Sequence, residues 1–142
     1  MRGDGRAALV LADGAVPQRT RFDAAWRGWD AGISMVIAAD GGARHAPVFG
    51  GRIDRWVGDG DSIDPADLDR LAAAGVAIDR SERDKDESHA ELAVLAPVHA
   101  GADRVVILGA LGGARVDHAL SNVGLLAHPA LDGVEVWLFD EA

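Results

Sequence analysis

Two carboxylates separated by a single residue are the clearest chemical signal in the chain. Asp59 and Asp61 stand in the run Gly-Asp-Gly-Asp-Ser, where glycines allow the backbone to turn both carboxylates towards one cation. Magnesium prefers oxygen ligands and commonly binds one or two carboxylates together with water and substrate phosphates. The alternative is an acidic turn in which Asp61 or Ser62 caps the next helix. Metal binding and helix capping are both open for this segment.

A glycine-rich loop at 109–113 is the second candidate. It contains Gly109, Gly112 and Gly113, and it lies between an apolar run and a helix-like segment. Backbone N–H groups in such a turn, together with the N-terminus of the following helix, attract phosphate. The spacing matches neither the dinucleotide-binding fingerprint nor the Walker A pattern. The segment is therefore either a phosphate cradle or a tight turn without a ligand.

Polar side chains open the otherwise apolar helix expected after this loop, namely Arg115, Asp117, His118 and Asn122. The forked donors of Arg115 suit phosphate. His118 and Asn122 lie one helical turn apart and can donate to a nucleotide or hold Asp117. The alternative is a polar helix start in which Asp117 interacts favourably with the helix dipole. We favour the functional interpretation because the rest of the helix is apolar.

The charged run at 84–91 is a weaker candidate. Lys85 and Asp86 precede Ser88, and Glu91 follows three residues after that serine. Ser88 and Glu91 make a capping box, which is a sufficient structural reason for both. Only the position of this run, after a strand, makes it a candidate for binding.

The elements that must position these residues alternate along the chain. Apolar runs predict strands, and amphipathic stretches predict helices. The expected strands are 7–12, 34–39, 54–57, 76–79, 104–108 and 134–139, and the expected helices are 17–29, 65–74, 88–99 and 116–127. The pattern predicts an α/β fold, a Rossmann-like three-layer parallel sheet of about six strands with helices on both faces.

Ligands of such sheets bind outside the carboxyl ends of the strands. Asp40 follows the second expected strand, and Asp59 and Asp61 follow the third. Lys85 and Asp86 follow the fourth strand, and the glycine-rich loop follows the fifth. The candidate residues are therefore expected to gather at one edge of the sheet. The four tryptophans, Trp26, Trp29, Trp56 and Trp137, are expected to be packing residues.

Composition restricts the class of protein. The 142 residues carry a net charge of −9, and 49% of them are hydrophobic, which indicates one soluble globular domain. The acidic balance disfavours nucleic-acid binding, which needs a basic surface. The chain has no cysteine, which excludes disulfides and thiolate metal sites. Without an apolar run of about 18 residues or a signal peptide, we expect a cytoplasmic protein with no membrane partner.

Four segments in order resemble the catalytic domain of thiamine pyrophosphokinase. They are AADGGA (38–43), VGDGDSI (57–63), KDESHAELAV (85–94) and GALGGARVDHALSNVGLL (109–126). Each motif is weak alone, but the ordered set covers nearly the whole chain and is specific. The resemblance implies an enzyme that transfers the diphosphoryl group of ATP to thiamine and releases AMP. It also implies a homodimer, and a catalytic domain spanning 1–142 without the family's C-terminal β-sandwich.

The resemblance also implies roles for individual residues. Asp59 and Asp61 would hold magnesium on the phosphates of ATP, the co-substrate, and Asp40 and Asp86 would lie at the active centre. The nucleotide and thiamine would be bound by Gly41, Gly42, Ser62, Lys85, Ser88, Gly109, Gly112, Gly113, Arg115, Asp117, His118 and Asn122. In a reaction of this type, positioning and neutralisation of charge dominate.

The sequence departs from the family pattern at the expected metal site. The family usually reads Lys-Asp-x-Thr-Asp, and its last Asp binds magnesium, whereas Ser88 and His89 stand here. Imidazole suits softer metals than magnesium, so His89 would make manganese an alternative ion. Ala114 is one extra residue before Arg115 and changes how that arginine is aimed. Two alternatives follow: the same reaction on another hydroxymethyl acceptor such as a pterin, and a non-catalytic nucleotide-binding homologue.

Overall fold

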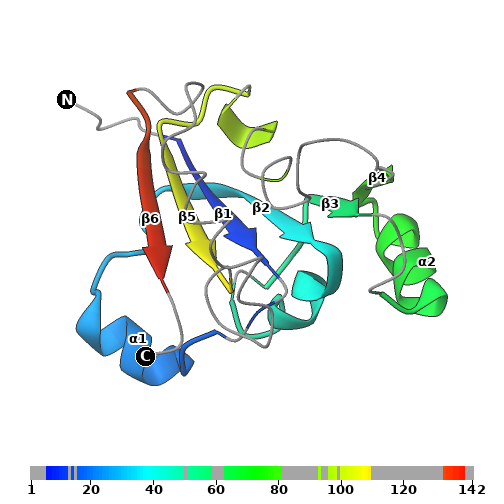
Figure 1. Cartoon of the computed structure of the whole chain (residues 1–142), viewed down its shortest axis with the longest axis horizontal. Coiled ribbons are helices and arrows are strands. Elements are labelled where there is room, and N and C mark those ends of the chain that lie inside the picture. The colour runs from blue at the N-terminus through cyan, green and yellow to red at the C-terminus, as the bar shows by residue number, and fades with distance from the viewer. Residues whose placement is uncertain are drawn as a thin grey trace.

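A six-stranded parallel sheet organises the computed structural model of the chain (Figure 1). The structure describes residues 6–12, 14, 16–49, 51–58, 63–80, 93, 96–98, 100–109 and 133–139. Its strands are β1 (Ala7–Leu11), β2 (Ile33–Ala39), β3 (Arg55–Gly58), β4 (Ala77–Arg80), β5 (Arg104–Leu108) and β6 (Glu135–Phe139). Every expected strand is present, with ends that differ from the prediction by about one residue.

The central strands are apolar throughout because both faces of the sheet are covered. All five residues of β1 are buried, as expected for a strand in the middle of a parallel sheet. One face packs against Phe22 of α1 and, further along the sheet, against Leu68 of α2. The other face packs against Ala93 and the helical residues 96–98. The predicted three-layer α/β class is therefore confirmed.

The strand order is β4-β3-β2-β1-β5-β6. The chain runs outwards from β1 to β4 and then returns to pair β5 with the other side of β1. The order therefore reverses between β1 and β5, and the crevice at such a switch point is where sheets of this type bind ligands. All the strands run in the same direction, so their carboxyl ends lie along one edge (Figure 1).

The first helix is shorter than predicted. Helix α1 spans Arg19–Ala25, with Gln18 as its N-cap, rather than residues 17–29. Turns occupy residues 26–32, and Gly28 has a φ of +81°, which a right-handed helix does not accommodate. Trp29 turns inwards here and is only 2% exposed. The helix-like pattern in the sequence therefore extends beyond Ala25, where the helix itself ends.

Helix α2 (Pro65–Ala73) begins as predicted but has a different cap. Asp64 is its N-cap, and the Asp64 carboxylate accepts a hydrogen bond from the backbone N–H of Ala66 at 3.0 Å. The interpretation that Asp61 or Ser62 caps this helix is therefore wrong. The helix ends before Gly75, which has a φ of +91° and makes the expected left-handed turn.

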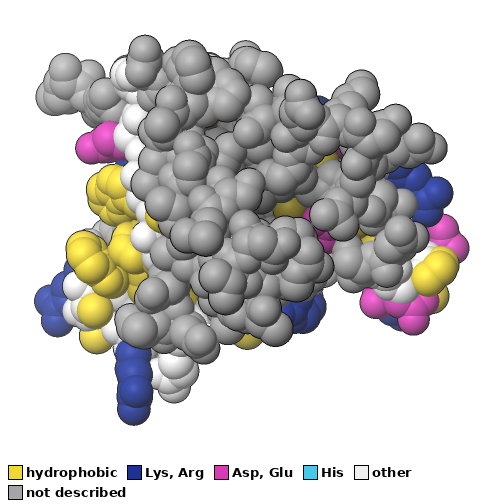
Figure 2. Space-filling view, in the orientation of Figure 1, with side chains coloured by type: hydrophobic (Ala, Val, Ile, Leu, Met, Phe, Trp, Pro, Cys, Tyr) yellow, Lys and Arg dark blue, Asp and Glu magenta, His cyan; other side chains and the backbone are white. Residues whose placement is uncertain are grey.

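Aromatic side chains gather on the side of the molecule that carries β6 and α1, where Figure 2 shows hydrophobic atoms next to basic ones. Trp26 is 54% exposed, so it is not a core residue, although its ring lies 5.1 Å from that of Phe139. Trp29, by contrast, is buried as predicted. Within the described part of the chain, no helix is long and apolar enough to cross a membrane.

Candidate functional site

Asp40 is the described candidate residue with the most unusual conformation. It follows β2 directly and begins the short helix η1 (Asp40–His45), which was not predicted. Its φ is +52°, and it is the only described residue other than glycine with a positive φ. Asp tolerates this left-handed region better than most residues, but a residue stays there only when its surroundings hold it. The Oδ1 atom of its carboxylate is buried.

The register of the sheet brings Asp40 to Gly58. Ala39 of β2 pairs with Val57 of β3, so Asp40, the first residue after β2, lies beside Gly58, the last residue of β3. A Cβ atom at position 58 would lie 2.7 Å from Oδ1 of Asp40 and 2.7 Å from Cζ2 of Trp56. Only glycine therefore leaves room for the carboxylate. The carboxylate of Asp40 thus lies against the residue that directly precedes Asp59 in the sequence.

Two further glycines pack tightly at the same edge of the sheet. A Cβ at Gly42 would lie 2.0 Å from the backbone oxygen of Leu11, and a Cβ at Gly109 would lie 2.5 Å from that of Ala12. Gly109 also has a φ of +81° and accepts a hydrogen bond from the N–H of Gly14 at 2.7 Å. Close backbone packing therefore explains glycine at 42 and 109. A role of Gly41, Gly42 or Gly109 in nucleotide binding stays a prediction.

Two residues at this edge were not predicted to make polar contacts. Trp56 is fully buried, and its indole Nε1 donates to the backbone oxygen of Asp40 at 2.9 Å. A buried indole N–H needs an acceptor, and that rule is the signal by which Trp56 could have been found. The Nε2 atom of His45 lies 2.8 Å from the backbone oxygen of Gly14, which ties the end of η1 to the segment after β1. Nothing in the sequence indicated that contact.

The other predicted site residues lie outside the described part of the chain. Among the described residues, no group of three or more His, Cys, Asp or Glu side chains could hold a metal ion. At the carboxyl edge, the structure describes Asp40, Gly58 and the glycines at 42 and 109. The expected metal ligands stay predictions. The predicted site residues outside the described part are Asp59, Asp61, Ser62, Lys85, Asp86, Ser88, His89, Gly112, Gly113, Arg115, Asp117, His118 and Asn122.

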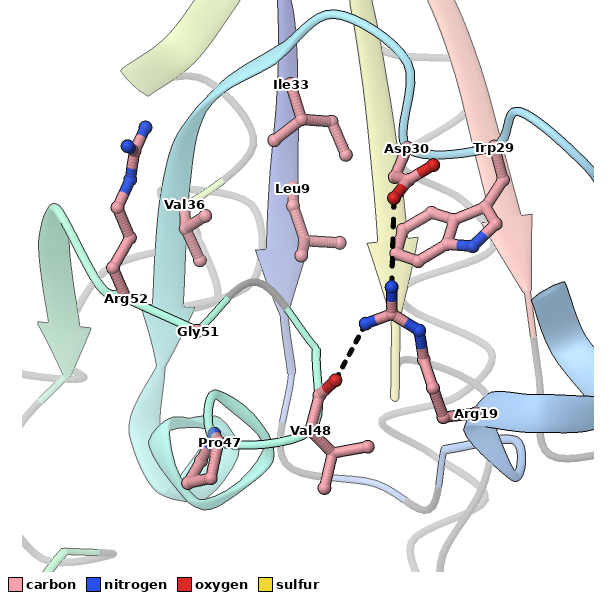
Figure 3. A pocket seen from close by; sticks show the side chains of 10 residues that line it. All are labelled: Leu9, Arg19, Trp29, Asp30, Ile33, Val36, Pro47, Val48, Gly51 and Arg52. Atoms are coloured by element: carbon pink, nitrogen blue, oxygen red, sulfur yellow. Dashed lines mark hydrogen bonds and ion pairs between the residues drawn. The ribbon is translucent and has the colours of Figure 1, made fainter.

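A hollow of about 380 Å³ lies over the face of β1 and β2 (Figure 3). Its floor is Leu9, Ile33 and Val36, and Arg19 points into it beside Trp29. Pro47, Val48, Gly51, Arg52 and Asp30 complete its rim. Leu9 is fully buried, and Trp29 and Val36 are each 2% exposed, whereas Val48 on the rim is 54% exposed.

The charges around this hollow pair with one another. The Nη1 atom of Arg19 donates to the backbone oxygen of Val48 at 2.7 Å, and its Nη2 lies 3.7 Å from the carboxylate of Asp30. Its Nε donates to Asp23 at 3.0 Å, and the indole of Trp29 donates to the same carboxylate at 2.8 Å. The hydrogen bond from Trp29, and then that from Arg19, lowers the pKa of Asp23 below 3.8. These contacts join α1 to the turns at 26–32 and to Val48 after η1.

The family model of the thiamin pyrophosphokinase catalytic domain matches residues 29–138, which include β2 to β5, all of β6 but its last residue, and the edge that carries Asp40 and Gly58. The chain belongs to this family. The family membership that the four motifs predicted is therefore confirmed. A comparison with curated protein sequences found no match.

Solved structures of thiamin pyrophosphokinases share the fold of this catalytic domain. A family protein from Enterococcus faecalis is 24% identical with a TM-score of 0.71, and the match covers 95% of this chain and 61% of that one. The enzyme from Bacillus subtilis is 22% identical with a TM-score of 0.72, covering 94% of this chain and 60% of the other. The enzyme from Candida albicans is 18% identical with a TM-score of 0.68, covering 94% and 57%. This chain thus spans about three fifths of the length of these relatives.

Proposed function

We propose that the chain is the ATP-binding catalytic part of an enzyme that transfers the diphosphoryl group of ATP to thiamine. Membership of the thiamin pyrophosphokinase family supports this proposal. The observation that links this proposal to particular residues is the contact between the carboxylate of Asp40 and Gly58. That contact lies at the carboxyl edge of a parallel sheet, where such folds bind their ligands.

In the proposed reaction, the hydroxyl oxygen of thiamine forms a bond to the β-phosphorus of ATP. The bond between that phosphorus and the bridging oxygen of the α-phosphate breaks, AMP leaves with the bridging oxygen, and the hydroxyl proton is released. The chain must bring these groups into line and offset the charge of the phosphates. Rigid placement of Asp40 beside β3 suits that task.

We propose that a divalent cation binds at this edge of the sheet. A carboxylate with an Oδ1 buried among Gly58 and Trp56 offers the kind of hard oxygen donor that magnesium prefers. We propose that Asp59 and Asp61 hold the ion with Asp40 beside them, and that His89 lies near it. Magnesium or manganese, when bound, neutralises charge on the phosphates.

The direct test is formation of AMP from ATP by the intact protein, with and without thiamine, under magnesium and under manganese. The proposal predicts AMP that depends on thiamine, accompanied by an equal amount of thiamine diphosphate. AMP that appears only with a hydroxymethylpterin in place of thiamine would keep the reaction class and change the acceptor. No AMP with either acceptor, despite measurable ATP binding, would contradict a catalytic role.

The histidine at position 89 favours one alternative, a nucleotide-binding homologue without activity. His89→Asp restores the residue that the family usually has at this position. If the natural chain is inactive for lack of this carboxylate, the variant gains thiamine-dependent AMP formation with magnesium. If the chain is an active enzyme, the natural form already produces AMP and the variant mainly changes the preference between magnesium and manganese. The homodimer, the cytoplasmic location and the assignment of residues 1–142 as one catalytic domain stay predictions.

A further inference from the structure

The indole of Trp56 makes a polar contact that packing alone does not require. Trp56 belongs to β3 and is fully buried between Ala38 of β2 and Leu68 of α2. Its Nε1–H donates to the backbone oxygen of Asp40 at 2.9 Å, across sixteen residues of sequence. This hydrogen bond joins the interior of β3 to the first residue after β2.

Asp40 is the residue whose backbone most needs such support. Its φ of +52° is unfavourable for a residue with a Cβ atom. The orientation of its carbonyl group depends on the same backbone angles that direct its side chain. A donor that fixes this carbonyl therefore also helps to fix the carboxylate.

The ring of Trp56 and the carboxylate of Asp40 both lie next to Gly58. A Cβ at Gly58 would lie 2.7 Å from Oδ1 of Asp40, 2.7 Å from Cζ2 of Trp56 and 2.8 Å from its Cη2. The carboxylate and the indole ring thus both border the space above Gly58. The indole N–H of Trp56 contacts the backbone of Asp40. The indole ring borders the same space above Gly58 as the carboxylate of Asp40.

We propose that Trp56 is a positioning residue, which holds Asp40 in its left-handed conformation and so orients the carboxylate towards the proposed metal and phosphate site. The expected effect of Trp56 on magnesium binding rests on the proposed function. The expected effect of Trp56 on the conformation of Asp40 does not depend on that function. The two effects can therefore be measured separately.

Trp56→Phe is the appropriate variant because it keeps an aromatic ring and removes the indole donor. Trp29→Phe is a matched control, since Trp29 is also buried, at 2% exposed, and its Nε1 donates to Asp23 at 2.8 Å in the hollow over β1 and β2. Both substitutions remove one indole hydrogen bond and shrink one buried ring. Only the first of them touches the neighbourhood of Asp40.

The first readout is the magnesium concentration that gives half-maximal ATP binding to the intact protein, measured by calorimetry. We expect Trp56→Phe to raise it about fivefold, which corresponds to one neutral hydrogen bond. Trp29→Phe should leave it unchanged. In an Asp40→Asn background, Trp56→Phe should have no further effect on magnesium, because Trp56 acts through that carboxylate. An equal effect of Trp56→Phe in both backgrounds would overturn the proposal.

The second readout is the backbone φ of Asp40, obtained from NMR couplings, which requires no bound ligand. We expect a positive φ in the natural protein and in Trp29→Phe, and a loss of that conformation in Trp56→Phe. If the natural protein binds no magnesium-ATP, the proposed function fails while this readout still tests the role of Trp56. If Trp56→Phe does not fold, the benzothiophene analogue of tryptophan at position 56 replaces only the N–H group. A positive φ retained in a folded variant of either kind would overturn the proposal.

Discussion

Two buried tryptophans donate their indole N–H groups in different surroundings, and the difference separates a candidate site from a structural support. Trp29 donates to Asp23, six residues earlier, within a group of charges that pair with one another. Trp56 donates to a backbone oxygen sixteen residues away, at a left-handed aspartate packed against a glycine. The first arrangement joins α1 to the turn that follows it. The second holds one carboxylate in an unfavourable conformation at the edge where ligands bind.

The largest expected effect comes from Gly42→Ala, at the carboxyl edge. The added Cβ would lie 2.0 Å from the backbone oxygen of Leu11, so the main chain itself must shift. We expect the free energy of unfolding to fall by about 3 kcal/mol or more, as in severe overpacking. Urea denaturation measures this loss.

Gly51→Ala, on the rim of the hollow, is the matched control for that variant. Gly51 has a φ of +72°, but a Cβ there meets nothing within 4 Å. Backbone strain alone should cost about 1–2 kcal/mol. Equal losses for the two variants would show that the edge is no more tightly packed than the hollow.

Asp40→Asn should reduce the enzymatic rate without reducing the free energy of unfolding. Asn also tolerates a left-handed backbone and has nearly the same volume, so we expect the free energy of unfolding to change little. Loss of the charge should reduce thiamine-dependent AMP formation about a hundredfold, a typical value for a group that stabilises charge. Stability and rate are measured on the same preparation. A variant with full activity would remove Asp40 from the proposed site.

Trp29→Phe should change the pKa of Asp23, beside the hollow, without changing activity. The pKa of Asp23 is below 3.8 because Trp29 and Arg19 donate to the carboxylate. A lowered pKa in the folded state stabilises the protein above pH 3.8, and this contribution disappears as the pH falls through the folded value. The variant should raise the pKa of Asp23, and the stability gap to the natural protein should narrow below pH 3.8. Carboxyl NMR titration measures the pKa, and an unchanged value would contradict the assigned cause.

The smallest effect is expected for Arg52→Ala on the rim of the hollow. The Nε of Arg52 lies 3.2 Å from the carboxylate of Asp54, and its Nη2 donates to the backbone oxygen of Ser34 at 2.6 Å, but both contacts are exposed and the two side chains of the ion pair are 56% and 41% exposed. Exposed ion pairs contribute at most about 1 kcal/mol, so thermal unfolding should hardly change. A loss well above that value would show that the rim contributes more than a surface pair.

The sequence predicted the strands well because buried central strands are continuous apolar runs bounded by turns. It failed at the end of α1, since a hydrogen bond from Trp29 to Asp23 and the left-handed Gly28 stop the helix before its pattern ends. It also missed Asp64 as the cap of α2.

The position of Asp40 could be predicted from the sequence, but its contacts could not. The position of Asp40 after a strand indicated the carboxyl edge, and the structure confirms that location. The contact between Asp40 and Gly58 depends on the register of Ala39 with Val57, which no local pattern specifies. The same register makes Trp56 a donor rather than only a packing residue. The roles of Asp59, Asp61 and the glycine-rich loop stay predictions.

The most direct test of the site is an NMR titration of the intact protein with magnesium-ATP that follows the backbone amide signals of both regions. We expect shifts at Asp40, Gly58 and Gly109, at the carboxyl edge of the sheet. The signals of Arg19 and Gly51, which line the hollow, should not change. Shifts confined to the hollow, or no shift at the edge when the protein is saturated with ligand, would contradict the assignment.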